Sequence, residues 1–236
     1  MGRFLVPAAF LALLFSGAAF ANSTFPACAS DNLANYIADT VNTATVNDGC
    51  AVGVLDYINF AYIPGTNAPS ASAIEVNPIT GGFSFGPASA GINQTVTFEI
   101  DYSMVIDPAP IVTGDNLHID PPSGDVFVTE YFCNDTSYIG SGLCSAHVPA
   151  QSATVGTPAS GFPDTVPVTF NPPVTTSQEV GIVFTLIGSS TAGASFDGLD
   201  SGSIVSITPE PASAAAFLVG FLALAGGYKL KKQRTR

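Results

Sequence analysis

The sequence contains no tryptophan, and it has no Lys or Arg between Phe4 and Tyr228. A chain whose whole middle lacks cations cannot neutralise phosphate groups, so we expect no nucleic-acid partner. The same gap excludes a P-loop lysine, a Schiff-base lysine and an arginine clamp. The six cationic residues all lie at the two ends of the chain, as Arg3, Lys229, Lys231, Lys232, Arg234 and Arg236.

A sequence motif for zinc binding is also missing. There is no Cys-x-x-Cys, and the only histidines are His118 and His147. Nearby carboxylates could orient the ring of His118, but Asp is common in loops for turn formation alone. We therefore predict no catalytic residue, no cofactor and no enzyme. A secreted hydrolase that uses carboxylates or a histidine is the alternative, because paired carboxylates can be distant in sequence.

Residues 1–21 have the features of a secretory signal peptide. Arg3 supplies a positive start, an apolar run follows, and Ala19-Phe20-Ala21 forms a small-x-small cleavage site. The apolar run is too short to span a membrane well. We expect a Sec-type export machinery to recognise it and cleavage to occur before Asn22.

The C-terminal segment has the features of a membrane span with a basic end. Residues 212–228 carry no charge, and as a helix they would be about 25 Å long, close to the ~30 Å hydrocarbon core. The tail 229–236 is rich in Lys and Arg, which places it on the cytoplasmic side. We predict a C-terminal transmembrane helix over 212–228, with the preceding domain outside the cytoplasm. The basic residues of the tail are Lys229, Lys231, Lys232, Arg234 and Arg236.

The tripeptide Pro209-Glu210-Pro211, the short apolar span and the basic tail, taken together with the N-terminal signal, resemble the PEP-CTERM protein-sorting signal. Members of this family are exported proteins of Gram-negative bacteria, often of species that make exopolysaccharide. The resemblance covers about the last 28 residues and implies processing by an exosortase, a membrane-embedded transpeptidase-like enzyme. It therefore implies a precursor anchored transiently in the inner membrane and a mature protein at the cell surface or in the extracellular matrix.

The domain between these signals, residues 22–208, is acidic. Of the 18 Asp and Glu residues of the chain, only Glu210 lies outside it. These carboxylates form either a solvated surface or, as the sharper alternative, a calcium site. Neither the segment with Asp115, Asp120 and Asp125 nor the segment with Asp197 and Asp200 matches an EF-hand loop. Turn formation explains the acidic residues of both segments, so we assign no metal. The calcium candidates are Asp115, Asp120, Asp125, Asp197 and Asp200.

All four cysteines lie in this domain, as Cys28, Cys50, Cys133 and Cys144. An even number of cysteines in an exported chain indicates disulfides, and four cysteines allow three pairings. The pairs Cys28–Cys50 and Cys133–Cys144 close the shortest loops, and we favour them.

The hydropathy pattern predicts an all-β fold, an antiparallel β-sandwich with a short N-terminal helix over 31–39. Leu33, Tyr36 and Ile37 fall at the i, i+3, i+4 spacing of one helix face. Residues 94–105 alternate strictly between apolar and polar, and so do residues 180–186, which is the pattern of strands with one buried face. Pro and Gly separate the segments. Other strands are expected at 51–63, 72–77, 82–86, 125–132, 166–170 and 202–208, and long loops at 149–163 and 188–203.

The stretch from Cys28 to Ile63 resembles the opening of a group of exported PEP-CTERM proteins of uncharacterised role, and this resemblance supports a Cys28–Cys50 bridge. The domain organisation is thus a signal peptide (1–21), a β-sandwich (22–208) and a sorting signal (209–236). We predict a non-enzymatic surface or matrix protein with a structural, adhesive or polysaccharide-binding role. Its expected partners are the exosortase, the inner membrane and an exopolysaccharide.

Overall fold

The computed structural model describes residues 25–40, 49–106, 110–120, 122–133, 151–157 and 159–207. Nearly all of them belong to one compact unit, Ser23–Ser206. The predicted signal peptide, the sorting motif Pro209-Glu210-Pro211, the span 212–228, the basic tail and His147 lie outside the described residues. Within the part that is described, no helix is long and apolar enough to cross a membrane.

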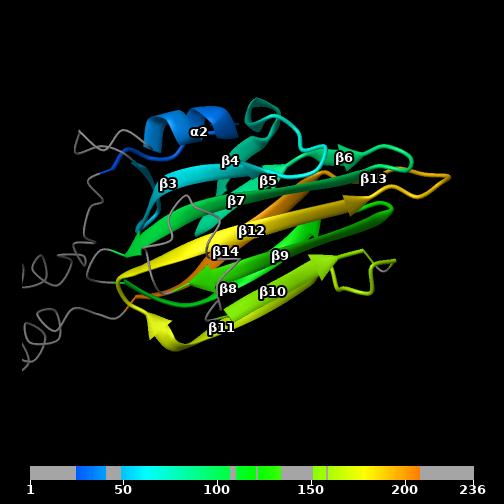
Figure 1. The fold of residues 1–236 in the computed structure, drawn as a ribbon. Helices are drawn as coiled ribbons and strands as arrows, with labels where there is room; N and C mark the ends of the chain where they lie inside the picture. The colour runs from blue at the N-terminus through cyan, green and yellow to red at the C-terminus, as the bar shows by residue number, and fades with distance from the viewer. Residues whose placement is uncertain are drawn as a thin grey trace, which may run out of the picture. The chain divides into compact units, whose positions relative to one another are not determined.

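Two six-stranded sheets lie face to face (Figure 1). All strand pairs whose register is described are antiparallel, so the predicted antiparallel sandwich is confirmed. Sheet A has the order β10 (Gln151–Gly156), β9 (Asp125–Cys133), β12 (Ser177–Ile187), β7 (Thr95–Ile106), β3 (Leu55–Pro64) and β2 (Gly49–Val52). Sheet B has the order β1 (Asp31–Asn32), β4 (Glu75–Ile79), β5 (Gly82–Gly86), β14 (Gly198–Ile207), β8 (Pro110–Asp120) and β11 (Thr165–Val174).

Three small elements complete the described fold. Strands β6 (Ala88–Ala90) and β13 (Ala194–Phe196) form a two-stranded sheet of their own. A 3₁₀ turn, η2, covers Ala71–Ala73. The predicted loops at 149–163 and 188–203 are therefore only partly correct, because β10, β13 and the start of β14 fall inside them. Their many Ser, Thr, Gly and Ala residues obscure the alternation, although Ala153 and Val155 are buried as in any other strand of the sandwich.

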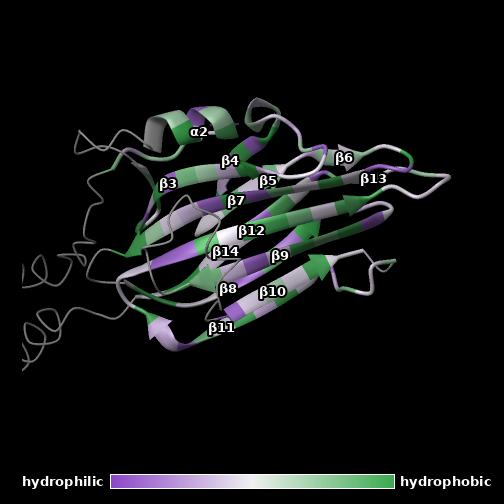
Figure 2. Cartoon of the chain, in the orientation of Figure 1, coloured by the Kyte–Doolittle hydropathy of each residue, from purple (hydrophilic) through white to green (hydrophobic). Residues whose placement is uncertain are grey.

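The alternation in β7 and β12 places their apolar residues in the core, as predicted. Val96, Phe98 and Ile100 of β7 are buried, and so are Ile182 and Phe184 of the neighbouring β12. Figure 2 shows the change between hydrophobic and hydrophilic residues along these strands. The polar face of β7 is not wet throughout, however, because Asp101 and Ser103 are completely buried as well.

The widest part of the core is built from six rings that we call the aromatic cluster. Its centre is Phe83 of β5, whose ring lies edge-on to Tyr57 at 4.7 Å between centroids and edge-on to Phe60 at 5.2 Å. Edge-to-face contacts of this kind add to the free energy gained by burial. Residues of both sheets and of the helix therefore meet at one ring. The members are Tyr36, Tyr57, Phe60, Phe83, Phe85 and Tyr102.

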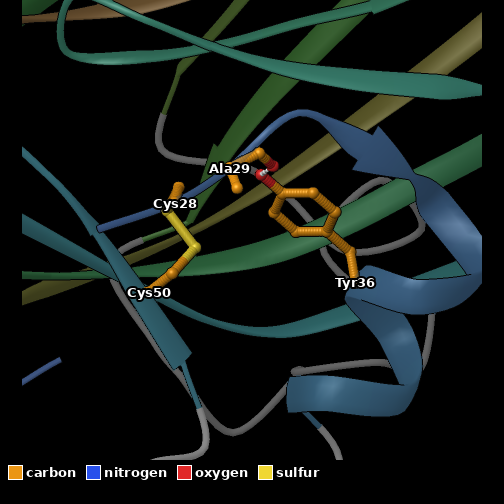
Figure 3. The surroundings of a disulfide bond; sticks show 4 residues. All are labelled: Cys28, Ala29, Tyr36 and Cys50. Carbon is orange, nitrogen blue, oxygen red and sulfur yellow. Dashed lines mark hydrogen bonds between the residues drawn. A yellow bond between two sulfur atoms is a disulfide. The ribbon is translucent and has the colours of Figure 1, made fainter. Parts of the chain in front are cut away.

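The N-terminal helix α2 spans Leu33–Thr40, close to the predicted 31–39. Asn32 Oδ1 accepts a hydrogen bond from the backbone N–H of Asn35 at 3.1 Å, as a helix N-cap does. Leu33 and Tyr36 are buried, which confirms the apolar face that the spacing indicates. The hydroxyl of Tyr36 donates to the carbonyl of Ala29 at 2.6 Å, and this bond holds the helix against the segment before it (Figure 3).

The disulfide Cys28–Cys50 is present, as predicted (Figure 3). Next to it, Cys28 N–H donates to the carbonyl of Ala51 at 2.9 Å, and Ala51 N–H donates to the carbonyl of Pro26 at 2.8 Å. The bridge thus fixes the N-terminal segment to the edge strand β2. Cys133 is also disulfide-bonded. Its expected partner, Cys144, lies outside the described residues, so that pairing stays a prediction.

Candidate functional site: a polar row on sheet B and a buried acid pair

Polar side chains form a line across the outer face of sheet B. Asn77 of β4 pairs with Ser84 of β5, and Ser84 pairs with Asp200 of β14. On the other side of β14, His118 of β8 pairs with Thr165 of β11. These residues are partly or fully exposed, and Ser84, Asp200 and His118 have buried neighbours on both sides along their strands.

Two contacts between β14 and β8 join these halves. A Cβ on Gly198 would lie 3.6 Å from Asp120 Oδ2, and Ser203 Oγ donates to Asp115 Oδ2 at 3.1 Å. Both contacts fit one antiparallel register, and that register places Asp200 beside His118. Five strands thus contribute one residue each to a continuous line. We call it the polar row: Asn77, Ser84, Asp200, His118 and Thr165.

His118 is held on both sides of its ring. Its Nε2 lies 3.1 Å from Asp120 Oδ1 and its Nδ1 lies 2.8 Å from Thr165 Oγ1. An ionised carboxylate only accepts hydrogen bonds, so Nε2 carries a proton and donates to Asp120, and in the neutral ring Nδ1 accepts from the Thr165 hydroxyl. The side chain remains 35% exposed. A ring bound in this way presents a fixed edge to a ligand, but neither nitrogen is free to take a proton from a substrate.

Gly198 lies next to the polar row and has no side chain that would project from the outer face of sheet B. A Cβ at this position would lie 3.2 Å from Ser84 Oγ as well as near Asp120. A larger side chain would therefore stand between Ser84 and Asp120. The glycine therefore leaves no side chain between Ser84 and Asp120.

A shallow hollow lies where β10 ends and β11 begins. Phe162 is 39% exposed there, and its ring lies 6.0 Å from that of Phe127. The backbone N–H of Ile119 donates to the carbonyl of Asp164 at 2.9 Å, which ties the hollow to the strand that carries His118. Sequence reasoning missed Phe162, although a single aromatic residue in a tract of small residues was a usable signal. The lining residues are Pro122, Gly156, Gly161, Phe162, Pro163 and Asp164.

Inside the sandwich, two carboxyl groups from opposite sheets lie in the core. Glu130 of β9 is completely buried and Asp115 of β8 is 1% exposed. Ser201 Oγ donates to Glu130 Oε1 at 2.6 Å and accepts from the hydroxyl of Tyr102, whose oxygen is 2.9 Å away. No cationic side chain can pair with either acid, since Lys and Arg occur only at the chain ends.

The two acids differ in how well their charge is stabilised. Burial raises the pKa of Asp115 to about 6, against the lowering effect of hydrogen bonds from Ser203 Oγ and from the backbone N–H groups of Gly202 and Asn116. Burial and the nearby charge of Asp115 raise the pKa of Glu130 well above its usual value, and only Ser201 opposes this. The ionised form is therefore better stabilised at Asp115, and Glu130 binds a proton more tightly.

The predicted calcium candidates are not assembled into one site. Asp115 points into the core, whereas Asp120, five residues later on the same strand, is exposed on the outer face. Asp125 begins β9 of sheet A, and Asp197 and Asp200 belong to the β13–β14 region. Among the described residues, no group of three or more Asp, Glu, His and Cys side chains is arranged to hold a metal ion.

No protein-family model and no curated protein matches the chain. Two solved structures are similar to it. One is TmCBM61 in complex with β-1,4-galactotriose, with 11% identity and a TM-score of 0.31 over 61% of this chain and 88% of that one. The other is the enzymatically active domain of tailspike protein 4 of bacteriophage CBA120, with 12% identity and a TM-score of 0.29 over 65% of this chain. The match spans only 20% of the tailspike chain. Similarity this low supports no functional argument.

Proposed function

We propose that this chain is a non-enzymatic β-sandwich protein that binds polysaccharide on the outer face of sheet B. The observation that carries the proposal is the polar row, which presents amide, hydroxyl, carboxylate and imidazole groups across a flat face. Neighbouring strands lie about 4.8 Å apart, so the amide, hydroxyl and carboxylate groups form a regular line of hydrogen-bond donors and acceptors, and the imidazole presents the edge of its ring. A sugar polymer with hydroxyl groups along its length is suited to such a line.

The charge of the domain selects among polysaccharides. Every Asp and Glu except Glu210 lies in residues 22–208, and no Lys or Arg does. A polymer of uronic acids or sulfated sugars would be repelled and would find no cation to bind. The ligand is therefore a neutral polysaccharide or one that carries amino groups.

Binding fits the described residues better than hydrolysis does. A glycoside hydrolase needs two carboxyl groups that reach the glycosidic bond. Asp115 and Glu130 are both buried in the core, where an external ligand does not reach them. His118, the other candidate, has both ring nitrogens engaged by Asp120 and Thr165.

The signals at the two ends of the chain support a location for this function outside the cytoplasm. We propose that an exosortase-like enzyme cuts near Pro209-Glu210-Pro211 and delivers the domain to the cell surface or matrix. Replacing these three residues by alanine should leave export intact and hold the precursor in the inner membrane. Mass spectrometry of the wild-type product from its host provides the test: a mature protein that still carries residues 212–236 would contradict processing.

The binding proposal is tested by affinity electrophoresis of the full chain in gels that contain dextran, chitosan or alginate. We expect retardation by dextran or chitosan and none by alginate. Asp200→Ala and His118→Ala should abolish the retardation. Ser152→Ala, at an exposed position on sheet A, is the matched control. Retardation that survives Asp200→Ala and His118→Ala would place the binding surface elsewhere.

A further inference from the structure

The core of the sandwich contains two carboxyl oxygens that no hydrogen bond satisfies. Glu130 Oε2 and Asp115 Oδ1 are both inaccessible, and neither has a partner among the described residues. Their sister oxygens are occupied, Glu130 Oε1 by Ser201 and Asp115 Oδ2 by Ser203. Leaving a buried polar atom unpaired is costly, and leaving a buried charge unpaired is more so. Something must therefore satisfy these two oxygens.

Among the described residues, the groups that face the pair include no cation. From sheet A, Tyr57 of β3 and Tyr102 of β7 act on the pair electrostatically. Burial, first of all, and the nearby Asp115 and Glu130 raise the pKa of both phenols, so neither phenol supplies a charge near neutral pH. Beside the acids in their own sheets are the apolar residues Ala153, Ile182 and Val168. The remaining neighbours, Ser201 and Ser203, offer hydroxyls that are already in use.

The donors around the two acids are unequal. Asp115 receives Ser203 Oγ and the N–H groups of Gly202 and Asn116, which is enough to hold an ionised carboxylate. Glu130 receives only Ser201. An ionised Glu130 would thus be a nearly unsolvated charge next to a second one. A protonated Glu130 would be neutral and could donate through its free oxygen.

We propose that Asp115 and Glu130 together form a buried proton-binding site, in which Glu130 keeps its proton at neutral pH and donates it toward Asp115 Oδ1. In this arrangement Glu130 is neutral and the site holds a single charge, which lies on the better-solvated acid. The proposal is independent of the polar row, since neither acid reaches the outer face.

The sign of the resulting pH dependence is opposite to that of a salt-bridged carboxylate. A carboxyl group whose pKa is higher in the folded chain than in the unfolded chain binds its proton more tightly when folded. Its contribution to stability is present below the unfolded value and is lost as the pH rises through the folded one. For Asp115 that window runs from about 4 to about 6, and for Glu130 it extends from 4.5 to a pH well above that. The fold should therefore be more stable at pH 5 than at pH 8.

The test is thermal unfolding of the full chain at pH 5 and pH 8, followed by near-ultraviolet circular dichroism. We expect the wild-type Tm to be roughly 2–4 °C higher at pH 5. Glu130→Gln mimics the protonated acid, because its amide accepts from Ser201 and donates toward Asp115. It should raise the Tm at pH 8, leave it nearly unchanged at pH 5, and so remove most of the difference. Glu75→Gln, at an exposed position on β4, should leave the difference in place.

The opposite variant separates the two roles. The carboxylate of Asp115 accepts hydrogen bonds from three donors. Asp115→Asn replaces one of its acceptor oxygens by an NH2 group, so it should lower the Tm at both pH values. In carbon-13 spectra of the wild-type chain, the chemical shift of the Glu130 carboxyl carbon should be that of a protonated acid at pH 7. A lower Tm of Glu130→Gln at both pH values, or a Glu130 carboxyl that titrates near pH 4, would overturn the proposal. So would a rise in the wild-type Tm with Ca²⁺ at pH 8 that Glu130→Gln abolishes, since a cation would then occupy the site.

Discussion

The aromatic cluster and the acid pair occupy the same core, yet they are held together in different ways. Around Phe83, rings from both sheets meet edge to face, and every contact is between apolar surfaces. Around Glu130 and Asp115, the polar contacts are hydrogen bonds of defined direction, and one oxygen of each acid remains unpaired. Tyr102 belongs to both regions, because its ring packs in the cluster and its hydroxyl bonds to Ser201.

The difference shows which part of the core supplies stability and which part supplies sensitivity to conditions. Burial of apolar rings depends weakly on pH, and its loss leaves a cavity. A buried acid pair contributes little when neutral and costs much when charged. Mutations in the cluster should therefore be harmful at every pH, whereas mutations in the pair should change sign with the residue and with pH.

The largest effect should come from Phe83→Ala. This ring is completely buried and contacts five other rings of the cluster, so its removal leaves a cavity that rigid neighbours cannot fill. We expect a loss of about 3–5 kcal/mol in the free energy of unfolding, measured by chemical denaturation. Ile92→Ala, at a position that is 55% exposed, is the control and should cost less than about 1 kcal/mol. Equal costs for the two variants would mean that the cluster is not the main core.

The next effect concerns the bridge that ties the N-terminal segment to β2. Replacing both Cys28 and Cys50 by serine opens a loop with a sequence separation of 22. Chain entropy predicts a loss of about 3 kcal/mol. Because the bridge lies at the edge of sheet A, the double variant should still fold and keep its near-ultraviolet spectrum. A variant that is unfolded in buffer would instead make the bridge a requirement for folding.

A smaller effect distinguishes the two tyrosines that face the pair. Tyr102→Phe removes the phenolic hydroxyl that bonds to Ser201, and we expect a loss of about 1 kcal/mol in the free energy of unfolding. Tyr57→Phe removes the bond at 2.6 Å to the carbonyl of Gly81, which keeps a second donor in the N–H of Ser203. Its cost should therefore be lower, about 0.5 kcal/mol. The reverse order in urea unfolding would show that Ser201 does not depend on Tyr102.

The smallest change in stability is expected on the polar row. His118→Ala and Asp200→Ala alter partly exposed side chains and should change the free energy of unfolding by less than about 0.5 kcal/mol. Their effect on polysaccharide binding should be large, as described above. A strong loss of stability in either variant would mean that the row supports the fold rather than a ligand.

Sequence reasoning succeeded where one residue after another repeats a local pattern. Strand β7 was predicted to within one residue at each end, and its alternation identified the apolar residues that enter the core. Strand β12 was recognised from the alternation of residues 180–186 but is longer, Ser177–Ile187. Strand β8 was missed because Asp115 occupies an inward position between the buried Val112 and Leu117, which breaks the alternation. Helix α2 was found from the spacing of Leu33, Tyr36 and Ile37.

The site could not be predicted in the same way, because its members meet only after folding. Asp115 and Glu130 lie in different sheets, and nothing in the residues around Glu130 indicates that a second acid faces it. The polar row joins five strands that are scattered along the chain from β4 to β14. Asp120, Asp200 and His118 were recognised as candidates, but their grouping depends on the register between β14 and β8.

The position of β14 in its sheet has a mechanical consequence. This strand, which ends at Ile207, lies between β5 and β8 and is paired on both sides. Hydrogen bonds between strands run perpendicular to the strand axis. A force that draws on the chain beyond Ile207 along the axis of β14 therefore loads both ladders in shear, and many bonds must break together before the strand slides. A strand at the edge of a sheet, pulled away sideways, would release one bond at a time.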